Sequence, residues 1–348
     1  VIVFAGEDPN VVAAQIEAMG GRVSEITTSA WKSKIRATVS SARIADIAKL
    51  PPVSWIEPTP VFTLMNDIAA DIINVRPVWD THGLHGAGQI VAVCDSGLDQ
   101  GSALPASLHD DFEDGSGNSR VVALHNWVSG DSASDVNSGH GTHVAGSILG
   151  NGFLSGATPA SHLYPSTAYV GMAPEASLVM QAVEDNATGG LAGIRSDLNT
   201  LFQQAYDDGA RLHSNSWGSS AAQGYYTTYS QDVDEFMWDH PDFLAVYAAG
   251  NDGTDADGDG VVDLGSVTSP GTAKNCLTVG ATENLRPSFS STWGGSWAAD
   301  FPQDPINSDR IADNADGTAA FSGRGPMLDG RTKPDIAAPG TFIASTRS

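Results

Sequence analysis

Cysteine and long apolar runs are both scarce in this chain of 348 residues. Its two cysteines cannot form the disulfide scaffold of a small secreted domain. Both stand in apolar, strand-like runs, so we expect Cys94 and Cys276 to be buried free thiols. No apolar run approaches the ~20 residues that cross a bilayer. We therefore expect no membrane partner.

Basic residues are also few, with 17 Lys and Arg against 41 Asp and Glu and a net charge of −24. Such a chain has little attraction for phosphate backbones, which excludes nucleic acid as a partner. The first 58 residues are neutral, so the whole excess lies in residues 59–348. An acidic surface of this kind suits solubility, high salt or calcium. The change in charge predicts a domain boundary near residue 58.

The pattern of residues 1–58 predicts a small α+β domain. Apolar, strand-like segments at 1–6, 21–27, 33–39 and 53–58 alternate with helical patterns at 10–19 and 40–50. Gly20 and Gly21 end the first helix. The order βαββαβ is that of a ferredoxin-like, split βαβ unit. Residues 59–65, "TPVFTLM", read as an extended linker.

From residue 88 onward, near-continuous apolar runs alternate with helical patterns. The runs are 89–95, 177–183, 210–217, 243–250 and 275–281. Runs of this kind are typical of parallel strands covered on both faces. A helix is predicted over 194–209, with Ile194, Leu198, Leu201, Phe202 and Ala205 on one face. We expect an α/β, doubly wound, mostly parallel sheet that binds ligands at the carboxyl ends of its strands.

Asp95 and His140 are candidates for an acid–base pair. Asp95 ends the strand "VAVCD", although a turn or a helix cap would account for it equally well. His140 lies in "GHGTHVAG", and His143 would share its helical face. A zinc protease of the usual type needs a glutamate between two such histidines, and here only Gly and Thr intervene. The favoured interpretation is that Asp95 orients His140, which moves a proton, while His143 is structural.

Two further stretches follow predicted strands. The amide of Asn251 in "AAGND" can donate to an oxyanion, although Gly-Asn alone is also a common turn. "SNSWGSS", residues 214–220, ends another strand in small residues, and such an edge can bind a peptide backbone by β-augmentation. Together these stretches suit a site that holds an extended peptide.

A calcium site is expected in "DADGDGVVD". Asp255, Asp257 and Asp259 stand at alternate positions, followed by a glycine and Asp263, as in the first nine positions of a calcium loop. Position twelve is Ser266 rather than glutamate, so the loop is not a complete EF-hand. The alternative is a solvated acidic loop. Bound calcium would hold the neighbouring Asn251 segment in place.

In this order the motifs resemble those of the subtilisin-like serine proteases, the subtilases, over nearly the whole chain. Within that family, the motifs most resemble those of the large alkaline proteases of bacilli and their relatives. The matching stretches are "VAVCDSGLD", "GHGTHVAGSILGNG", "VGMAPEASL", "NSWGS", "AAGN", "SPGTAKNCLTVGATE" and "FSGRGPMLDGRTKPDIAAPGT". The resemblance implies a subtilisin-like fold, serine endopeptidase activity on proteins or peptides, and secretion.

The resemblance also implies roles for single residues. Asp95 would be the orienting acid, His140 the general base and Asn251 the oxyanion donor. Residues 1–58 would be a propeptide that assists folding and occupies the cleft as an inhibitor, and residues 66–348 the catalytic domain. The cleft would have one wall and one facing strand, formed by Ser216, Trp217 and Gly218 and by Thr188, Gly189 and Gly190, respectively.

The serine that should attack the substrate has no match in the sequence. The family carries it in Gly-Thr-Ser-Met-Ala, some way after "APGT", whereas here Gly-Thr is followed only by His, Asp, Ala or Phe. Ser345 and Ser348 follow "APGT" too closely. We expect a C-terminally incomplete catalytic domain, inactive alone, whose serine lies on a separate or omitted segment. The alternatives are a pseudoprotease that binds peptides without cleaving them and, more remotely, a metallopeptidase.

The linker contains a candidate processing site. Phe62 and Met65 are spaced to fill two apolar pockets, for the fourth and first residues before a cut. "NDIAADIINV" resembles the start of mature enzymes in this branch. We predict that the enzyme cleaves its own zymogen between Met65 and Asn66. An uncut linker is the alternative.

Overall fold

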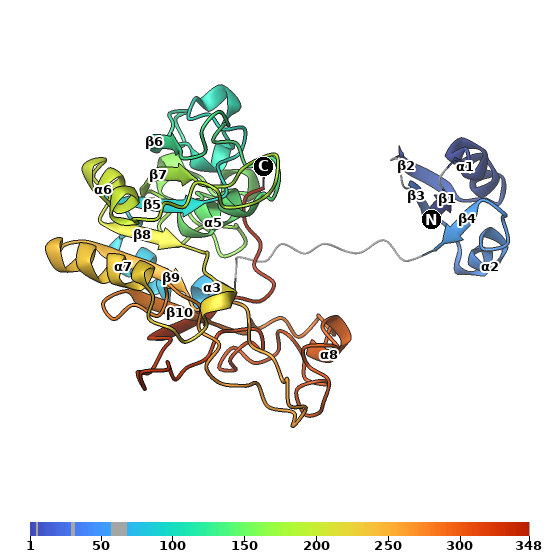
Figure 1. Cartoon of the computed structure of the whole chain (residues 1–348). Coiled ribbons are helices and arrows are strands. Elements are labelled where there is room, and N and C mark those ends of the chain that lie inside the picture. Colours follow the sequence, from blue (N-terminus) through green and yellow to red (C-terminus); the bar gives the residue numbers. More distant parts are fainter. Residues whose placement is uncertain (5, 29–31, 57–67, 348) are drawn as a thin grey trace. The chain divides into compact units, whose positions relative to one another are not determined.

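The computed structural model describes residues 1–4, 6–28, 32–56 and 68–347, and the chain divides into two compact units, Val1–Thr63 and Leu64–Ser348. Figure 1 colours both units along the sequence. The predicted processing site, with Phe62, Met65 and Asn66, lies outside the described residues and stays a prediction.

The smaller unit is a four-stranded sheet, in the order β2-β3-β1-β4, whose strand pairs are antiparallel. Its elements are β1 (Ile2–Phe4), α1 (Pro9–Ala18), β2 (Arg22–Thr28), β3 (Lys32–Thr38), the 3-10 helix η1 (Ser41–Arg43), α2 (Ile44–Ile47) and β4 (Val53–Trp55). This is the βαββαβ order that the sequence predicts. The core consists of Val3, Val12, Ala13, Ile16, Ile35 and Ile47.

Local residue chemistry sets the ends of α1. The Asp8 carboxylate accepts a hydrogen bond from the backbone N–H of Asn10, which caps the helix, and Pro9 occupies the first turn, where no N–H is needed. The helix ends before Gly20, whose φ of 85° is a left-handed conformation that glycine adopts without strain.

The larger unit contains a seven-stranded sheet in the order β11-β10-β9-β8-β5-β7-β6, with every strand pair parallel. This subtilisin-like, doubly wound α/β arrangement confirms the predicted fold class. The strands are β5 (Ile90–Asp95), β6 (Val121–Asn126), β7 (Ser177–Ala182), β8 (Leu212–Asn215), β9 (Leu244–Ala248), β10 (Leu277–Thr282) and β11 (Ile336–Pro339).

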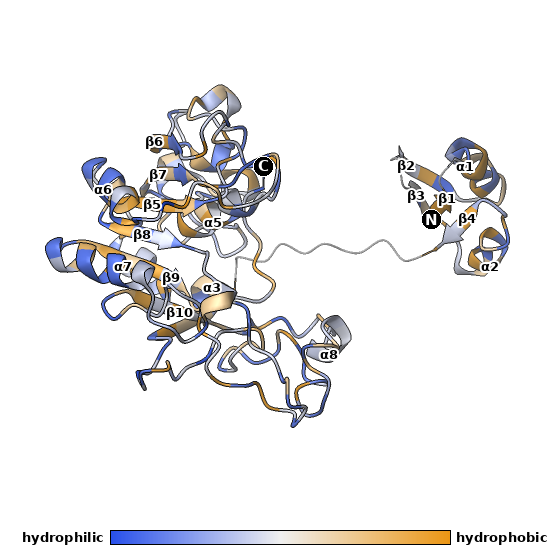
Figure 2. Ribbon diagram, viewed as in Figure 1, coloured by the Kyte–Doolittle hydropathy of each residue, from blue (hydrophilic) through white to orange (hydrophobic). Residues whose placement is uncertain are grey.

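Helices cover the two faces of this sheet. In Figure 2, α6 and α7 carry both hydrophilic and hydrophobic residues, as helices packed on one side do. The helices are α3 (Ala69–Ile72), α4 (Val75–His82), α5 (His140–Leu149), α6 (Asn199–Asp207), α7 (Thr228–Asp239) and α8 (Trp293–Ser296). The 3-10 helices are η2 (Pro105–Ser107), η3 (Asp110–Phe112), η4 (Phe153–Ser155), η5 (Pro159–Ser161) and η6 (Ser220–Ala222).

Strand β5 lies at the centre of the fold. Its side chains alternate between two cores: Val91 and Val93 pack with residues of α5, and Cys94 packs with residues of α6 and α7. The carboxyl end of β5 is also where the chain changes direction, because β7 and β6 lie on one side of it and β8 on the other. Such switch points bind ligands in open α/β sheets.

The helix predicted over 194–209 is shorter than expected. It begins at Asn199, because the Asp197 carboxylate accepts a hydrogen bond from the Asn199 N–H and so provides a start signal. Ile194 lies before the helix but still packs against the same core. The sequence pattern also predicts no strand at β6 or β11. Both are edge strands with two exposed residues each, so neither reads as a buried run.

A buried arginine ties several loops together. Arg120, at the start of β6, donates hydrogen bonds to the backbone carbonyls of Glu113, Ala176, Asp111 and Leu149, all within 2.9 Å. A guanidinium can satisfy this many acceptors because its donors are fixed in a planar fork. The hydrogen bonds of Arg120 therefore link the segments around β6, β7 and α5.

Both cysteines are buried and free, as predicted, and burial raises the pKa of each thiol. Within the described ranges, no helix combines the length and apolar character needed to cross a bilayer.

Candidate active site

Asp95 and His140 meet at the carboxyl end of β5. The Asp95 Oδ1 atom lies 2.6 Å from His140 Nδ1. Asp95 is the last residue of its strand and its side chain is buried, whereas His140 opens helix α5 and its side chain is 53% exposed. The buried carboxylate can therefore orient an imidazole whose other face remains accessible to a substrate.

A buried network fixes the start of α5 against β5. The Ser96 hydroxyl donates to Asp135 Oδ1 at 2.7 Å and accepts from the Gly141 N–H at 2.7 Å. Asp135 Oδ2 accepts from both the N–H and the hydroxyl of Thr142, each at 2.7 Å. A carboxylate at a helix N-terminus satisfies free amides and complements the helix dipole. This network sets where His140 stands.

Sequence reasoning missed Ser96 and Asp135. Asp135 lies in the polar stretch "SASDVNSG", where an aspartate is ordinarily a turn residue. Its burial, with only 1% of the residue exposed, comes from a tertiary contact with α5. A local pattern does not reveal such a contact.

Carboxylates raise the pKa of His140. The largest cause is the hydrogen bond to Asp95, and the negative charges of Asp95, Asp135 and Glu184 add to it, against a lowering by burial. The environment thus favours the imidazolium, which is the form that a general base acquires when it takes a proton.

His143 has a different environment. Burial lowers its pKa, and a hydrogen bond to the backbone of Ile343 acts against this. Its imidazole faces the 343–347 segment, where Thr346 donates a hydrogen bond to the carbonyl of Thr142 at 2.6 Å. In the described structure, the two histidines of the motif therefore have separate partners and do not converge on one acceptor.

Asn251 and Ser216 line one depression of about 300 Å³ at the carboxyl ends of β8, β9, β10 and β11. Gly250 precedes Asn251 with φ of 98°, and Thr268 leaves no room for a Cβ there. This turn keeps Asn251 at the surface, where it is exposed.

Trp217 joins β8 to β5. Its indole N–H donates to the carbonyl of Cys94 at 3.1 Å, and its ring packs edge-on against Tyr247 with centroids 5.4 Å apart. The contact lies one residue before Asp95. Gly218 next to it lies against Thr268, which leaves no space for a side chain.

The predicted facing strand at Thr188, Gly189 and Gly190 is wrong in its geometry. These residues are exposed and belong to a turn, because Asp185 accepts from the N–H groups of Thr188 and Gly189 and donates its own N–H to Gly190. Gly189 has φ of 73°, which an extended strand does not contain. The backbone of Asp185 therefore already satisfies the N–H groups of Thr188 and Gly189 and the carbonyl of Gly190. Its role in substrate binding stays a prediction.

The model of the Subtilase family matches residues 86–348. This chain belongs to the subtilase family. The match begins just before β5 and so includes Asp95, His140 and Asn251.

Relatives and solved structures agree with this membership. Serine protease/ABC transporter B family protein tagA of Dictyostelium discoideum is 28% identical over 323 residues, which are 78% of this chain and 17% of that protein. Serine protease AprX of Bacillus subtilis is 29% identical over 273 residues, 76% of this chain and 49% of AprX. The chain thus spans half or less of these relatives' lengths. The CspB protease of Clostridium perfringens has the same fold, with a TM-score of 0.55, 16% identity and 80% of each chain covered.

The acidic loop of this subtilase gathers three of its four predicted metal ligands. Carboxylate oxygens of Asp255, Asp257 and Asp259 lie within 4.8 Å of one another. Asp263 is not in that group, and its Oδ2 accepts from the Ala256 N–H at 2.7 Å. Ninth-position residues of calcium loops often bind through water, so this arrangement still fits a calcium site.

Proposed function

We propose that this subtilase is part of a serine endopeptidase that hydrolyses peptide bonds in proteins or peptides. The observation that carries the proposal is the 2.6 Å contact between Asp95 and His140 at the switch point of the sheet. In the proposed mechanism Asp95 holds the imidazole and stabilises its charged form, and His140 takes a proton from the serine and returns it to the leaving amine.

The attacking serine comes from outside the 348 residues in this proposal. In the described part of the chain, His140 Nδ1 faces Asp95, and no serine hydroxyl donates to the other ring nitrogen. That second nitrogen is the one that must receive the serine proton. The His140 side chain is 53% exposed, which leaves room for a serine from a further segment of the same protein or from a separate fragment.

Asn251 is the proposed oxyanion donor. Its amide is exposed at the rim of the same depression that Ser216 lines, so it can reach an oxygen of a peptide bound along that edge. Ser216, Trp217 and Gly218 form one proposed wall of the cleft, and the turn at residues 188–190 is proposed as the opposite wall. The wall is preorganised by the Trp217 contact to β5.

Three further proposals concern maturation and environment. Calcium bound by Asp255, Asp257 and Asp259, with Asp263 acting through water, would neutralise the mutual repulsion of these carboxylates. Residues 1–58 act as a propeptide that occupies the cleft until cleavage. The enzyme is secreted as a zymogen, which suits its acidic surface.

The test is hydrolysis of a denatured protein substrate by the full-length protein that contains this chain. Activity should be blocked by a serine-directed sulfonyl fluoride and abolished in His140→Ala. Asp95→Asn should lower kcat by about 10⁴-fold, because the imidazole loses its orienting carboxylate. A matched His82→Ala variant, altered at an exposed histidine, should keep full activity. A folded full-length protein that binds peptides without cleaving them would instead be the pseudoprotease.

A further inference from the structure

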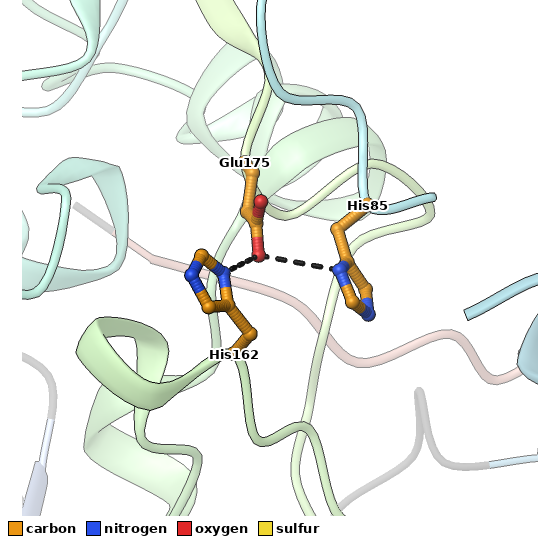
Figure 3. Close-up of side chains that lie close together, drawn as sticks. All are labelled: His85, His162 and Glu175. Carbon is orange, nitrogen blue, oxygen red and sulfur yellow. Dashed lines mark hydrogen bonds and ion pairs between the residues drawn. The ribbon is translucent and has the colours of Figure 1, made fainter. Parts of the chain in front are cut away.

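Two histidines and a glutamate converge away from the candidate active site (Figure 3). The Nδ1 atoms of His162 and His85 lie 2.6 Å and 3.3 Å from the same oxygen, Oε1 of Glu175. One ligand atom from each residue lies within 4.8 Å of the other two. Three potential metal ligands thus face one point from three loop segments.

The two inner members of this cluster are held in place. The side chains of His85 and Glu175 are only 11% and 15% exposed. The backbone N–H of Glu175 donates to the carbonyl of His85 at 2.9 Å. Tyr164 donates its hydroxyl to Glu175 Oε1 at 3.0 Å, and its ring lies 5.0 Å from that of His85. An ordered hydrogen-bond donor of this kind is what supports ligand carboxylates in metal sites.

The outer member closes the site from a separate loop. His162 follows η5 in a left-handed conformation, with φ of 53°, and hydrogen bonds between Thr158 and Leu163 brace its loop. Its side chain is 67% exposed, so the site is open to solvent on this side. A cavity of about 400 Å³ beside it, which Trp79 and Asp80 also line, has room for a water as a further ligand.

We propose that His85, His162 and Glu175 form a binding site for a divalent transition metal of the zinc class. Imidazole nitrogen and carboxylate oxygen suit zinc, and three protein ligands with a water complete a tetrahedron. With metal–ligand bonds of about 2.0–2.1 Å, tetrahedral ligand atoms lie roughly 3.4 Å apart. The 3.3 Å separation of His85 Nδ1 and Glu175 Oε1 already matches this spacing. Only the exposed His162 needs to move outward.

The site is distinct from the catalytic pair. His85 precedes β5 and Glu175 precedes β7, so both lie at the amino ends of these parallel strands, whereas Asp95 lies at the opposite end, paired with Ala182 of β7. A bound ion would join the segments before β5 and β7 to the loop that contains η5. We infer a role in stability of this edge of the sheet rather than in hydrolysis.

The proposal is tested by titrating Zn²⁺ into the untagged 348-residue chain in a calorimeter. One equivalent should bind and raise the melting temperature. His162→Ala and Glu175→Gln should each weaken binding by about tenfold or more, since even loss of a supporting contact costs that much. His162 is exposed, so its truncation should leave the fold intact.

The matched control is His82→Ala, which removes an exposed histidine of α4 outside the cluster and should bind Zn²⁺ like the unaltered chain. Asp255→Asn should also leave Zn²⁺ binding unchanged, because that loop is a separate cluster. The proposal is overturned if the unaltered chain does not bind Zn²⁺, or if His162→Ala and Glu175→Gln bind it with unchanged affinity.

Discussion

His140 and His143 stand one helical turn apart and have opposite electrostatic environments. The bond to Asp95 raises the pKa of the first, and burial lowers the pKa of the second. Carboxylates thus favour the protonated form of His140, whereas burial disfavours the protonated form of His143. This division lets a single helix carry a proton acceptor without placing two charges next to each other.

The difference predicts opposite pH dependences of stability in the 348-residue chain. A raised folded-state pKa means that His140 stabilises the fold below the unfolded pKa of about 6.5 and that this contribution is lost as pH rises through the folded value. His140→Ala should therefore lower the melting temperature more in mild acid than in mild base. For His143 the sign reverses, so its contribution is lost as pH falls.

Melting curves of both alanine variants and the unaltered chain, taken about one pH unit below and two units above 6.5, measure these slopes. The comparison between variants cancels the titration of the other groups. Parallel pH dependences for His140→Ala and His143→Ala would contradict the assignment.

At the scale of the element, the start of α5 depends on Asp135, which lies outside the helix, in the loop before it. Asp135 replaces the side chain that Gly139 cannot supply as a helix cap, since Gly139 has no polar group. The consequence is that His140 is positioned by two elements at once, β5 through Asp95 and the 135–139 loop through Thr142.

Asp135→Ala should lower the free energy of unfolding by about 1–3 kcal/mol, because it leaves buried donors of Ser96 and Thr142 without their acceptor. Chemical denaturation of the 348-residue chain measures this loss. Asp239→Ala, at an exposed carboxylate that ends α7, is the matched control and should change stability by less than about 0.5 kcal/mol. Equal effects of the two variants would show that the network adds nothing.

The acidic loop of Asp255, Asp257 and Asp259 is the second element with a testable prediction, because we propose that it binds calcium. Chelation should lower the melting temperature, because a cation that binds only the folded state stabilises it by mass action. The double variant Asp255→Asn, Asp257→Asn should melt at nearly the same temperature with and without chelator. Calcium added back after chelation should restore the unaltered chain but not the variant. A melting curve that excess chelator leaves unchanged would exclude a stabilising calcium ion.

Sequence patterns predicted the elements whose own residues determine them. β5 and β7 are mostly apolar runs, so their burial was predictable, as was the polar end of β5 at Asp95. The edge strands β6 and β11 were not, because exposure removes the apolar signal. The same limit applies at the site: Asp95 and His140 lie in recognisable motifs, whereas Asp135 and the cluster of Glu175 with two histidines arise from contacts between distant segments.

At the scale of the whole molecule, charge and compactness change near the same place. The neutral segment ends at residue 58, and the compact units divide between Thr63 and Leu64. Self-cleavage between Met65 and Asn66 would release the neutral unit from the acidic one. N-terminal sequencing of the mature full-length enzyme tests this, with His140→Ala as an uncleaved control. A mature start more than a residue or two from Asn66 would contradict the predicted site.

Arg120 gives the larger unit an internal cation that no chelator can remove. Its guanidinium sits among backbone carbonyls much as a metal ion would, but it is supplied by the chain during synthesis. These contacts of Arg120 therefore need no bound ion, whereas the proposed calcium site of Asp255, Asp257 and Asp259 needs one. If calcium binds there as proposed, a calcium-poor medium should destabilise the larger unit first at that loop.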